Sequence, residues 1–245
     1  AAGKATESES RDLPIDVWFS VVLRGFDRTA MDPGDEPREC SGQPVAVTWP
    51  TAMSADPRAK ARKLHITASV AAHNLLLDDG CLRGFEAWYK VMPPLRDREH
   101  IEALRLGVKD GTIDAIVSDH RPEDREHKVL EFGAAAFGII GLETAFAVAN
   151  TALKGSTSLR RIIDRFANGP RDVLGIRNVH VVEGAKAELT LFDPEINWTC
   201  EESDLPSRSH NTPFLGQRFA GRPIGIINNG QVRFAPAFQD VAVAG

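Results

Sequence analysis

The chain has 245 residues, of which 42% are hydrophobic and 26% are charged, and its formal net charge is -5. This length is enough for one large domain or two small ones. Because the chain is acidic and carries no stripe of interleaved basic and aromatic residues, the composition excludes an ordinary nucleic-acid-binding surface. No apolar run approaches the length of a membrane span, and the first ten residues lack the apolar core of a secretory signal. We therefore expect neither a nucleic acid nor a membrane as a partner.

The cysteines are few and far apart in the sequence. They are Cys40, Cys81 and Cys200, and no two of them form a Cys-x-x-Cys pair. Sparse, odd-numbered cysteines are typical of reduced thiols in a cytoplasmic protein. The sequence therefore predicts a cytoplasmic protein with three inert thiols.

Residues 1–43 are poorly patterned. Acidic and basic residues mix there with turn sequences around Pro33 and Pro37, and one apolar island, Val17–Leu23, fits either a strand or a helical turn. The rest of this segment reads as loop or disorder, because it offers little apolar surface to bury.

From residue 44 onward, β-branched apolar runs alternate with helical stretches. The predicted strands are Pro44–Thr48, Leu64–Val70, Ala87–Val91 and Ile113–Val117, and the predicted helices between them are Ser54–Lys63 and Asp97–Lys109. Gly111 is expected to cap the second helix. Strands that alternate with helices predict a parallel sheet with right-handed crossovers, and thus an α/β body.

The last third of the chain changes from helical to β pattern. Predicted helices at Gly141–Leu153 and Leu159–Ala167, the second ending near Asn168-Gly169-Pro170, precede a predicted strand Ala187–Phe192 that stops at Asp193-Pro194. Two further runs, Pro223–Ile227 and Gln231–Phe234, flank Asn228-Asn229-Gly230, which predicts a hairpin. We therefore divide the chain into a segment 1–43, an α/β body 44–178 and a small β part 179–245.

Five sequence blocks, in order, resemble those of the dihydroorotases. The blocks are Lys90–Arg96, similar to Lys-x-Asn-Pro-Pro-Leu-Arg; Asp110–Pro122, similar to Asp-Gly-Thr-Ile-Asp followed by Asp-His-x-Pro-His; Phe137–Thr144, similar to Gly-Ile-x-Gly-Leu-Glu-Thr; Gly184–Pro194, similar to Gly-x-x-Ala-Asp-Leu and Asp-Pro; and the loop Asn211–Gly216. Residues 1–43 show no convincing match. The chain is therefore identified as similar to the C-terminal portion of a dihydroorotase.

The resemblance implies a fold, a reaction and a metal. The fold would be a partial (β/α)8 TIM-type barrel, strands five to eight, with a small C-terminal β-sandwich part. The reaction would be the reversible hydrolysis of dihydroorotate to N-carbamoyl-L-aspartate in de novo pyrimidine biosynthesis. Zinc would be the cofactor, activating the attacking water.

The resemblance also places the site on particular residues. Asp119 follows the predicted strand Ile113–Val117, and the carboxyl ends of barrel strands carry the chemistry. The resemblance makes Asp119 the metal ligand and the catalytic acid–base group. The alternative is a purely structural role, in which Asp119 caps the turn that follows the strand. His120 would be a supporting residue, hydrogen-bonded behind the site.

Two substrate-binding positions of the family are substituted. Met92 stands where the family has Asn, and a thioether cannot donate the hydrogen bonds of an amide. Glu123 stands where the family has a His that contacts the substrate carboxylate, and a second carboxylate there repels an anion. His127, one helical turn later, is a candidate replacement, although a solvated His in the charged run 123–128 is the favoured interpretation.

The metal ligands are also incomplete. Asn74 occupies the position of a family zinc ligand His, and an amide is a poor zinc ligand. The neighbouring His73 would serve only if the loop shifted. No His-x-His occurs in this chain, so Asp119 alone remains of the usual ligands, and we expect this chain by itself to bind no zinc.

Three hypotheses remain open from the sequence. The first is the C-terminal portion of a dihydroorotase, inactive in isolation, whose complete protein acts on dihydroorotate. The second is a non-catalytic dihydroorotase-like partner of aspartate transcarbamoylase, or a homo-oligomer, which fits the losses at Asn74, Met92 and Glu123. The third is a truncated or frame-shifted product without function, which fits the poor patterning and turn-rich composition of residues 1–43. Four barrel strands alone would leave two open edges, so the chain would need a partner or its missing half.

Overall fold

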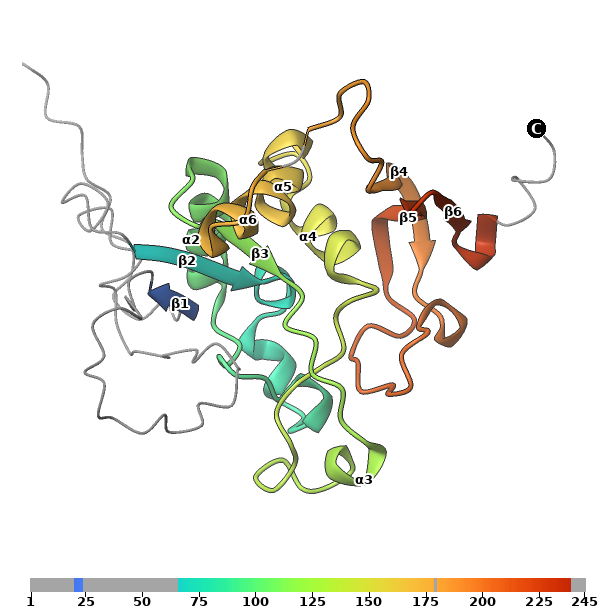
Figure 1. The fold of residues 1–245 in the computed structure, drawn as a ribbon. Coiled ribbons are helices and arrows are strands. Elements are labelled where there is room, and N and C mark those ends of the chain that lie inside the picture. The colour runs from blue at the N-terminus through green and yellow to red at the C-terminus, as the bar shows by residue number, and fades with distance from the viewer. Residues whose placement is uncertain (1–19, 24–65, 179, 239–245) are drawn as a thin grey trace, which may run out of the picture.

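The computed structural model describes residues 20–23, 66–178 and 180–238, which form two small sheets joined by helices (Figure 1). The strands are β1 (Ser20–Leu23), β2 (Ile66–Ala71), β3 (Ala115–Val117), β4 (Leu189–Thr199), β5 (Arg218–Asn228) and β6 (Gln231–Phe234). The helices are α2 (Arg98–Asp110), α3 (Arg125–Lys128), α4 (Ala145–Leu153), α5 (Leu159–Phe166) and α6 (Asn168–Leu174). Short 3-10 turns cover Ala72–Leu75, Asp79–Leu82, Ala87–Tyr89, Glu202–Asp204 and Pro236–Phe238.

The first sheet has the order β1-β2-β3. Strands β2 and β3 are parallel, with Ser69 opposite Ala115, and β1 adds antiparallel to the other edge of β2. The chain between β2 and β3 carries α2. This arrangement confirms the expected parallel strands connected through a helix, and the strands predicted at Leu64–Val70 and Ile113–Val117, both of which begin two residues later than predicted.

Helix α2 forms where the sequence predicts it, because both of its ends are capped. The Asp97 side chain accepts a hydrogen bond from the backbone N–H of His100, and Gly111 closes the helix in the left-handed conformation, with φ 94°. Its buried face includes Leu104 and Val108, which belong to the hydrophobic core, and the helix contacts α5 and the 3-10 turn Ala72–Leu75. The cap at Gly111 is therefore confirmed.

The strand predicted at Ala87–Val91 is wrong. Residues Ala87–Tyr89 form a 3-10 turn instead, in which the backbone N–H of Lys90 bonds to the carbonyl of Ala87. Pro93 and Pro94 follow and have no N–H to donate to a ladder, so a strand here would be poorly paired. As a result β2 pairs directly with β3. The expected strand Pro44–Thr48 and helix Ser54–Lys63 lie outside the described residues.

Helix α4 joins the two sheets. It begins at Ala145, four residues after the predicted start at Gly141, whose carbonyl accepts a hydrogen bond from the N–H of Ala145 at 2.9 Å. From α4, Asn150 Nδ2 donates to the carbonyl of Ala220 in β5 at 2.9 Å, and Thr151 Oγ1 accepts from the N–H of Ala220 at 2.9 Å. These contacts fix the β part against the α/β body.

Helices α5 and α6 follow α4, and both contact β3 of the first sheet (Figure 1). Helix α5 confirms the prediction at Leu159–Ala167. The sequence Asn168-Gly169-Pro170, expected only to end that helix, starts α6, because a proline is tolerated in the first turn of a helix, where N–H groups have no partner. Gly169 packs so closely against Asp114 that an added Cβ would lie 1.9 Å from its carbonyl oxygen.

The second sheet has the order β4-β5-β6. Strand β4 does not stop at Asp193-Pro194, as the sequence suggested, but continues to Thr199. A register shift between Asp193 and Asn197 interrupts the ladder, so Pro194 breaks no regular pairing there. The predicted hairpin is confirmed: Asn229 and Gly230 both have positive φ between the paired residues Asn228 and Gln231.

No helix within the described residues combines the length and the apolar character needed to cross a membrane.

Candidate functional site

Asp119 lies just beyond the carboxyl end of β3. Its backbone is in the left-handed conformation, with φ 45°, which turns the chain sharply after the strand. Its carboxylate accepts a hydrogen bond from Nε of Arg121 at 3.1 Å, and its side chain is 19% exposed. The carboxylate that the resemblance assigns to a metal is therefore held by a neighbouring cation.

A small pocket of about 20 Å3 lies at the carboxyl ends of β2 and β3. Asn74 lines it from the end of β2, Asp119 from the end of β3, and Pro93 from the block that carries Met92. The structure thus brings two of the predicted metal positions together. The pocket is the size of a water molecule rather than of a cyclic amide.

His73 lies beside Asn74 but is sealed inside the protein. It is 2% exposed, and both of its ring nitrogens are buried without a hydrogen-bond partner. Burial, together with the positive charge of Arg121, lowers the pKa of His73 to about 4, so the ring is neutral at physiological pH. Oδ1 of Asn74 is also buried without a partner.

His120 is tied to the backbone that follows β3. Its Nδ1 accepts hydrogen bonds from the N–H groups of Gly141 and Leu142, at 3.2 and 3.3 Å. Residue 120 also makes an isolated parallel bridge with Ile139. These contacts link the end of β3 to the block Phe137–Thr144, which fits the supporting role proposed for His120.

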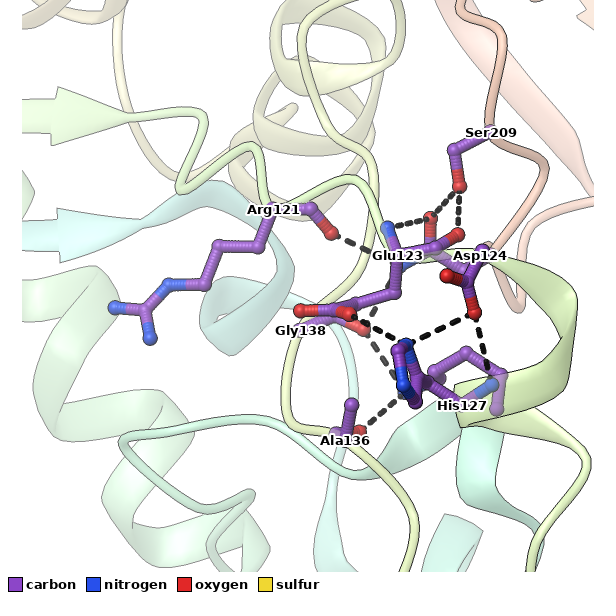
Figure 2. Close-up of polar contacts among 9 residues, drawn as sticks. Arg121, Glu123, Asp124, His127, Ala136, Gly138 and Ser209 are labelled. Carbon is purple, nitrogen blue, oxygen red and sulfur yellow. Dashed lines mark hydrogen bonds and ion pairs between the residues drawn. The ribbon is translucent and has the colours of Figure 1, made fainter.

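Glu123, Asp124 and His127 form an acidic turn at the start of α3 (Figure 2). His127 Nδ1 lies 2.9 Å from Asp124 Oδ1 and 4.0 Å from Glu123 Oε2, and its side chain is 63% exposed. The Arg121 side chain runs away from this group (Figure 2). His127 is therefore paired with carboxylates at the surface, as expected for a solvated histidine in a charged run.

A wide groove of about 850 Å3 opens next to the acidic turn. Its lining includes His120 and Glu123 from the α/β body and Arg208, His210 and Asn211 from the loop between β4 and β5. Asn211 Oδ1 accepts from the N–H of Glu123 at 3.2 Å, so this loop is bound to the turn that precedes α3.

Two buried lysines, which the sequence reasoning missed, hold the segment 132–138, called here the lysine-held loop. Lys90 Nζ donates to the carbonyls of Phe132, Gly133 and Ala135 at 2.7, 2.9 and 2.7 Å. Lys128 Nζ donates to the carbonyls of Ala136 and Gly138 at 2.9 and 3.0 Å. Burial lowers the pKa of Lys128 to about 8. The only sequence signal was that Lys90 opens the block Lys90–Arg96.

The residues present do not fit a zinc ion. Among the described residues, no three or more His, Cys, Asp or Glu side chains are grouped so that they could hold a metal. Asp119 is paired with Arg121, Asn74 offers an amide, and the His73 ring is enclosed away from the pocket. The arrangement can therefore bind a water molecule and position a carboxylate, but the side chains that the structure describes here do not make up a zinc-ligand set.

Known proteins similar to this chain are dihydroorotases. No protein-family profile matches the chain. The dihydroorotase of Pelobacter propionicus is 37% identical over 175 residues, which cover 71% of this chain and 41% of the relative. That of Anaeromyxobacter dehalogenans is 39% identical over 189 residues, covering 76% of this chain and 44% of the relative. The chain thus spans less than half the length of these two relatives.

A third relative reaches further along the chain. The dihydroorotase of Citrifermentans bemidjiense is 35% identical over 248 residues, covering 94% of this chain and 58% of the relative. Because so little of the chain is left uncovered, this match extends into residues 1–43, where the sequence analysis found none.

Solved structures with a similar fold are hydantoinases. A D-hydantoinase matches with a TM-score of 0.61 and 21% identity, covering 74% of this chain and 43% of its own length. The L-hydantoinase (dihydropyrimidinase) from Arthrobacter aurescens matches with a TM-score of 0.63 and 24% identity, covering 71% of this chain and 40% of its own. These neighbours are TIM-barrel amidohydrolases, and the described residues form part of such a fold.

Proposed function

The chain is homologous to dihydroorotases of the amidohydrolase superfamily, and on that premise we propose that its protein is a cyclic amidohydrolase of de novo pyrimidine biosynthesis, acting on dihydroorotate. We further propose that the residues of this chain, by themselves, do not catalyse the reaction. One observation carries the second point: the Asp119 carboxylate is bound by Arg121 and shares its pocket with the Asn74 amide.

The arrangement explains why hydrolysis needs more than this chain. Opening a cyclic amide requires an activated water, a group to manage its proton and contacts that hold the substrate. Asp119 is positioned for the second task, but its charge is already engaged. Met92 and Glu123 do not offer the donors that the family uses for the substrate, and Glu123 adds a like charge.

The test combines turnover with metal content. The purified chain is incubated with dihydroorotate, and separately with N-carbamoyl-L-aspartate, with and without added zinc, while chromatography follows both compounds and elemental analysis measures bound zinc. We expect no turnover above the protein-free blank and sub-stoichiometric zinc. Stoichiometric zinc with turnover that Asp119→Asn abolishes would refute the proposed inactivity. If turnover is observed, parallel reactions with a hydantoin show which ring is preferred.

A second candidate function is a non-catalytic partner of aspartate transcarbamoylase. The Arg121–Asp119 pair favours it, because a carboxylate neutralised within the chain suits a scaffold better than a hydrolase. Co-expression with the transcarbamoylase of the same source and size-exclusion chromatography would show a shared peak. Sedimentation of the chain alone distinguishes this complex from a homo-oligomer. Both candidate functions place the protein in the cytoplasm, in keeping with its scattered cysteines.

A further inference from the structure

Arg121 occupies a position to which the family pattern assigns no particular residue. It follows His120 in the block Asp110–Pro122, yet its guanidinium lies against the one carboxylate that the resemblance gives to the metal. Nε of Arg121 and Oδ1 of Asp119 are 3.1 Å apart, and the two side chains are 43% and 19% exposed. The carboxylate is therefore partly shielded from water while the arginine side chain is exposed, so the pair is a partly exposed ion pair of modest strength.

The backbone of Arg121 is fixed on both sides. Its N–H donates to the carbonyl of Ile139 at 2.9 Å, and its own carbonyl accepts from Nδ2 of Asn211 at 2.9 Å. Asn211 is only 2% exposed, so this second bond is sheltered from solvent. The side chain of Arg121 therefore starts from a well-determined position, and the entropy lost when it pairs with Asp119 is reduced.

Gly138 makes room for the stem of Arg121. Its φ is 120°, a conformation that other residues rarely adopt, and a Cβ added there would lie 2.5 Å from Cβ of Arg121. Both lysines fix Gly138 in turn: Lys128 Nζ donates to its carbonyl at 3.0 Å, and the backbone carbonyl of Lys90 accepts from its N–H at 2.9 Å. The lysine-held loop thus supports the arginine that faces Asp119.

We propose that Arg121 is a built-in counter-cation for Asp119, which balances the charge that a metal would otherwise balance and keeps divalent cations out of this site. A cation entering the pocket would meet a carboxylate that is already paired, and it would be repelled by the guanidinium beside it. Asn74 carries no charge with which to offset that repulsion. The inference rests on the proposed function only for the identity of the metal position.

The test is a double-mutant cycle with a metal arm. Wild type, Arg121→Gln, Asp119→Asn and the double variant are unfolded in urea and by heat, each with a chelator or with Mn2+, which prefers oxygen ligands. In chelator, each single change should raise the unfolding equilibrium constant by roughly two- to five-fold, the range of partly exposed ion pairs. The double variant should lose less unfolding free energy than the two single variants lose in sum.

The metal arm gives the sharper result. Mn2+ should leave the thermal midpoint of wild type unchanged, raise that of Arg121→Gln, and have no effect once Asp119→Asn is added. Arg125→Gln, a nearby arginine in α3, is the matched control and should respond as wild type does. If the glutamine variant does not fold, Arg121→Lys, which keeps a positive charge, should still exclude Mn2+.

Two outcomes would overturn the inference: strictly additive effects in the cycle, or equal stabilisation of wild type and Arg121→Gln by Mn2+. Neither readout depends on turnover, so a hydrolytically active wild-type chain would refute the proposed inactivity without deciding the role of Arg121.

Discussion

The lysine-held loop adjoins the carboxyl ends of β2 and β3. The buried polar groups of these two regions differ sharply in how many of them have hydrogen-bond partners. In the loop, two buried ammonium groups meet five backbone carbonyls. At the strand ends, both His73 ring nitrogens and Asn74 Oδ1 are buried without partners. The loop therefore contributes stability, and the strand ends carry polar groups whose burial costs it.

The largest effect should come from the loop. Lys128→Met removes both donors from the carbonyls of Ala136 and Gly138 inside the protein. We expect a loss of about 3 kcal/mol in the free energy of unfolding, because buried charge-assisted hydrogen bonds are each worth a few kcal/mol at most. Urea denaturation measures it. Lys109→Met, at the exposed end of α2, is the control and should change the free energy of unfolding by about 0.5 kcal/mol at most. Equal losses in the two variants would contradict the comparison.

His73 should make the strand ends sensitive to acid. Its pKa is lowered from the ordinary 6.5 to about 4 in the folded protein. Below pH 6.5 the ring gains a proton in the unfolded chain but not in the folded protein. The free energy of unfolding is therefore highest above pH 6.5 and decreases as the pH falls toward 4. The shift corresponds to about 3 kcal/mol at most across that window. Urea midpoints from pH 8 to 4 measure it. His73→Leu should flatten the part of the pH profile due to this ring, and an unchanged slope would show that His73 does not titrate as described.

Gly141 tests how tightly the end of β3 is joined to the block Phe137–Thr144. A Cβ at this position would lie 2.4 Å from the carbonyl oxygen of Ser118, so backbone must move. Gly141→Ala should cost about 2 kcal/mol, typical of overpacking in a close contact. Gly133→Ala is the control, since an added Cβ there meets no atom within 4 Å. If Gly141→Ala lost less unfolding free energy than Gly133→Ala, the contact between Gly141 and Ser118 would be less tight than described.

The smallest effect concerns α2, which lies outside both the strand ends and the lysine-held loop. Asp97→Ala removes the side chain that caps the helix and bonds the His100 ring, at 2.6 Å. We expect a loss of about 1 kcal/mol in unfolding free energy, the usual worth of such a cap. Asp97→Asn should retain most of the stability, because an amide oxygen also caps. Thermal denaturation of the three proteins decides whether capping or the His100 contact dominates.

Local signals in the sequence were sufficient for several elements. Asp97 and Gly111 bound α2 because capping depends on side chains and backbone angles within a few residues. Asn229-Gly230 formed the predicted hairpin for the same reason. The strand predicted at Ala87–Val91 failed because a short apolar run does not reveal whether an edge is available to pair with it.

The sequence by itself determined the family likeness, the two strands that become β2 and β3, and the place of Asp119 just after the second of them. Only the tertiary structure decided that Arg121 holds the Asp119 carboxylate, that His73 is sealed without partners, and that two lysines support the adjoining loop. The lysines bond to carbonyls as far as 45 positions away, and the state of His73 depends on exclusion from water. The Arg121–Asp119 pair is local in sequence, but the backbone of Arg121 is held by bonds to Ile139 and Asn211, which are distant. Neither distance nor burial can be read from a local pattern, because both are properties of the packed chain.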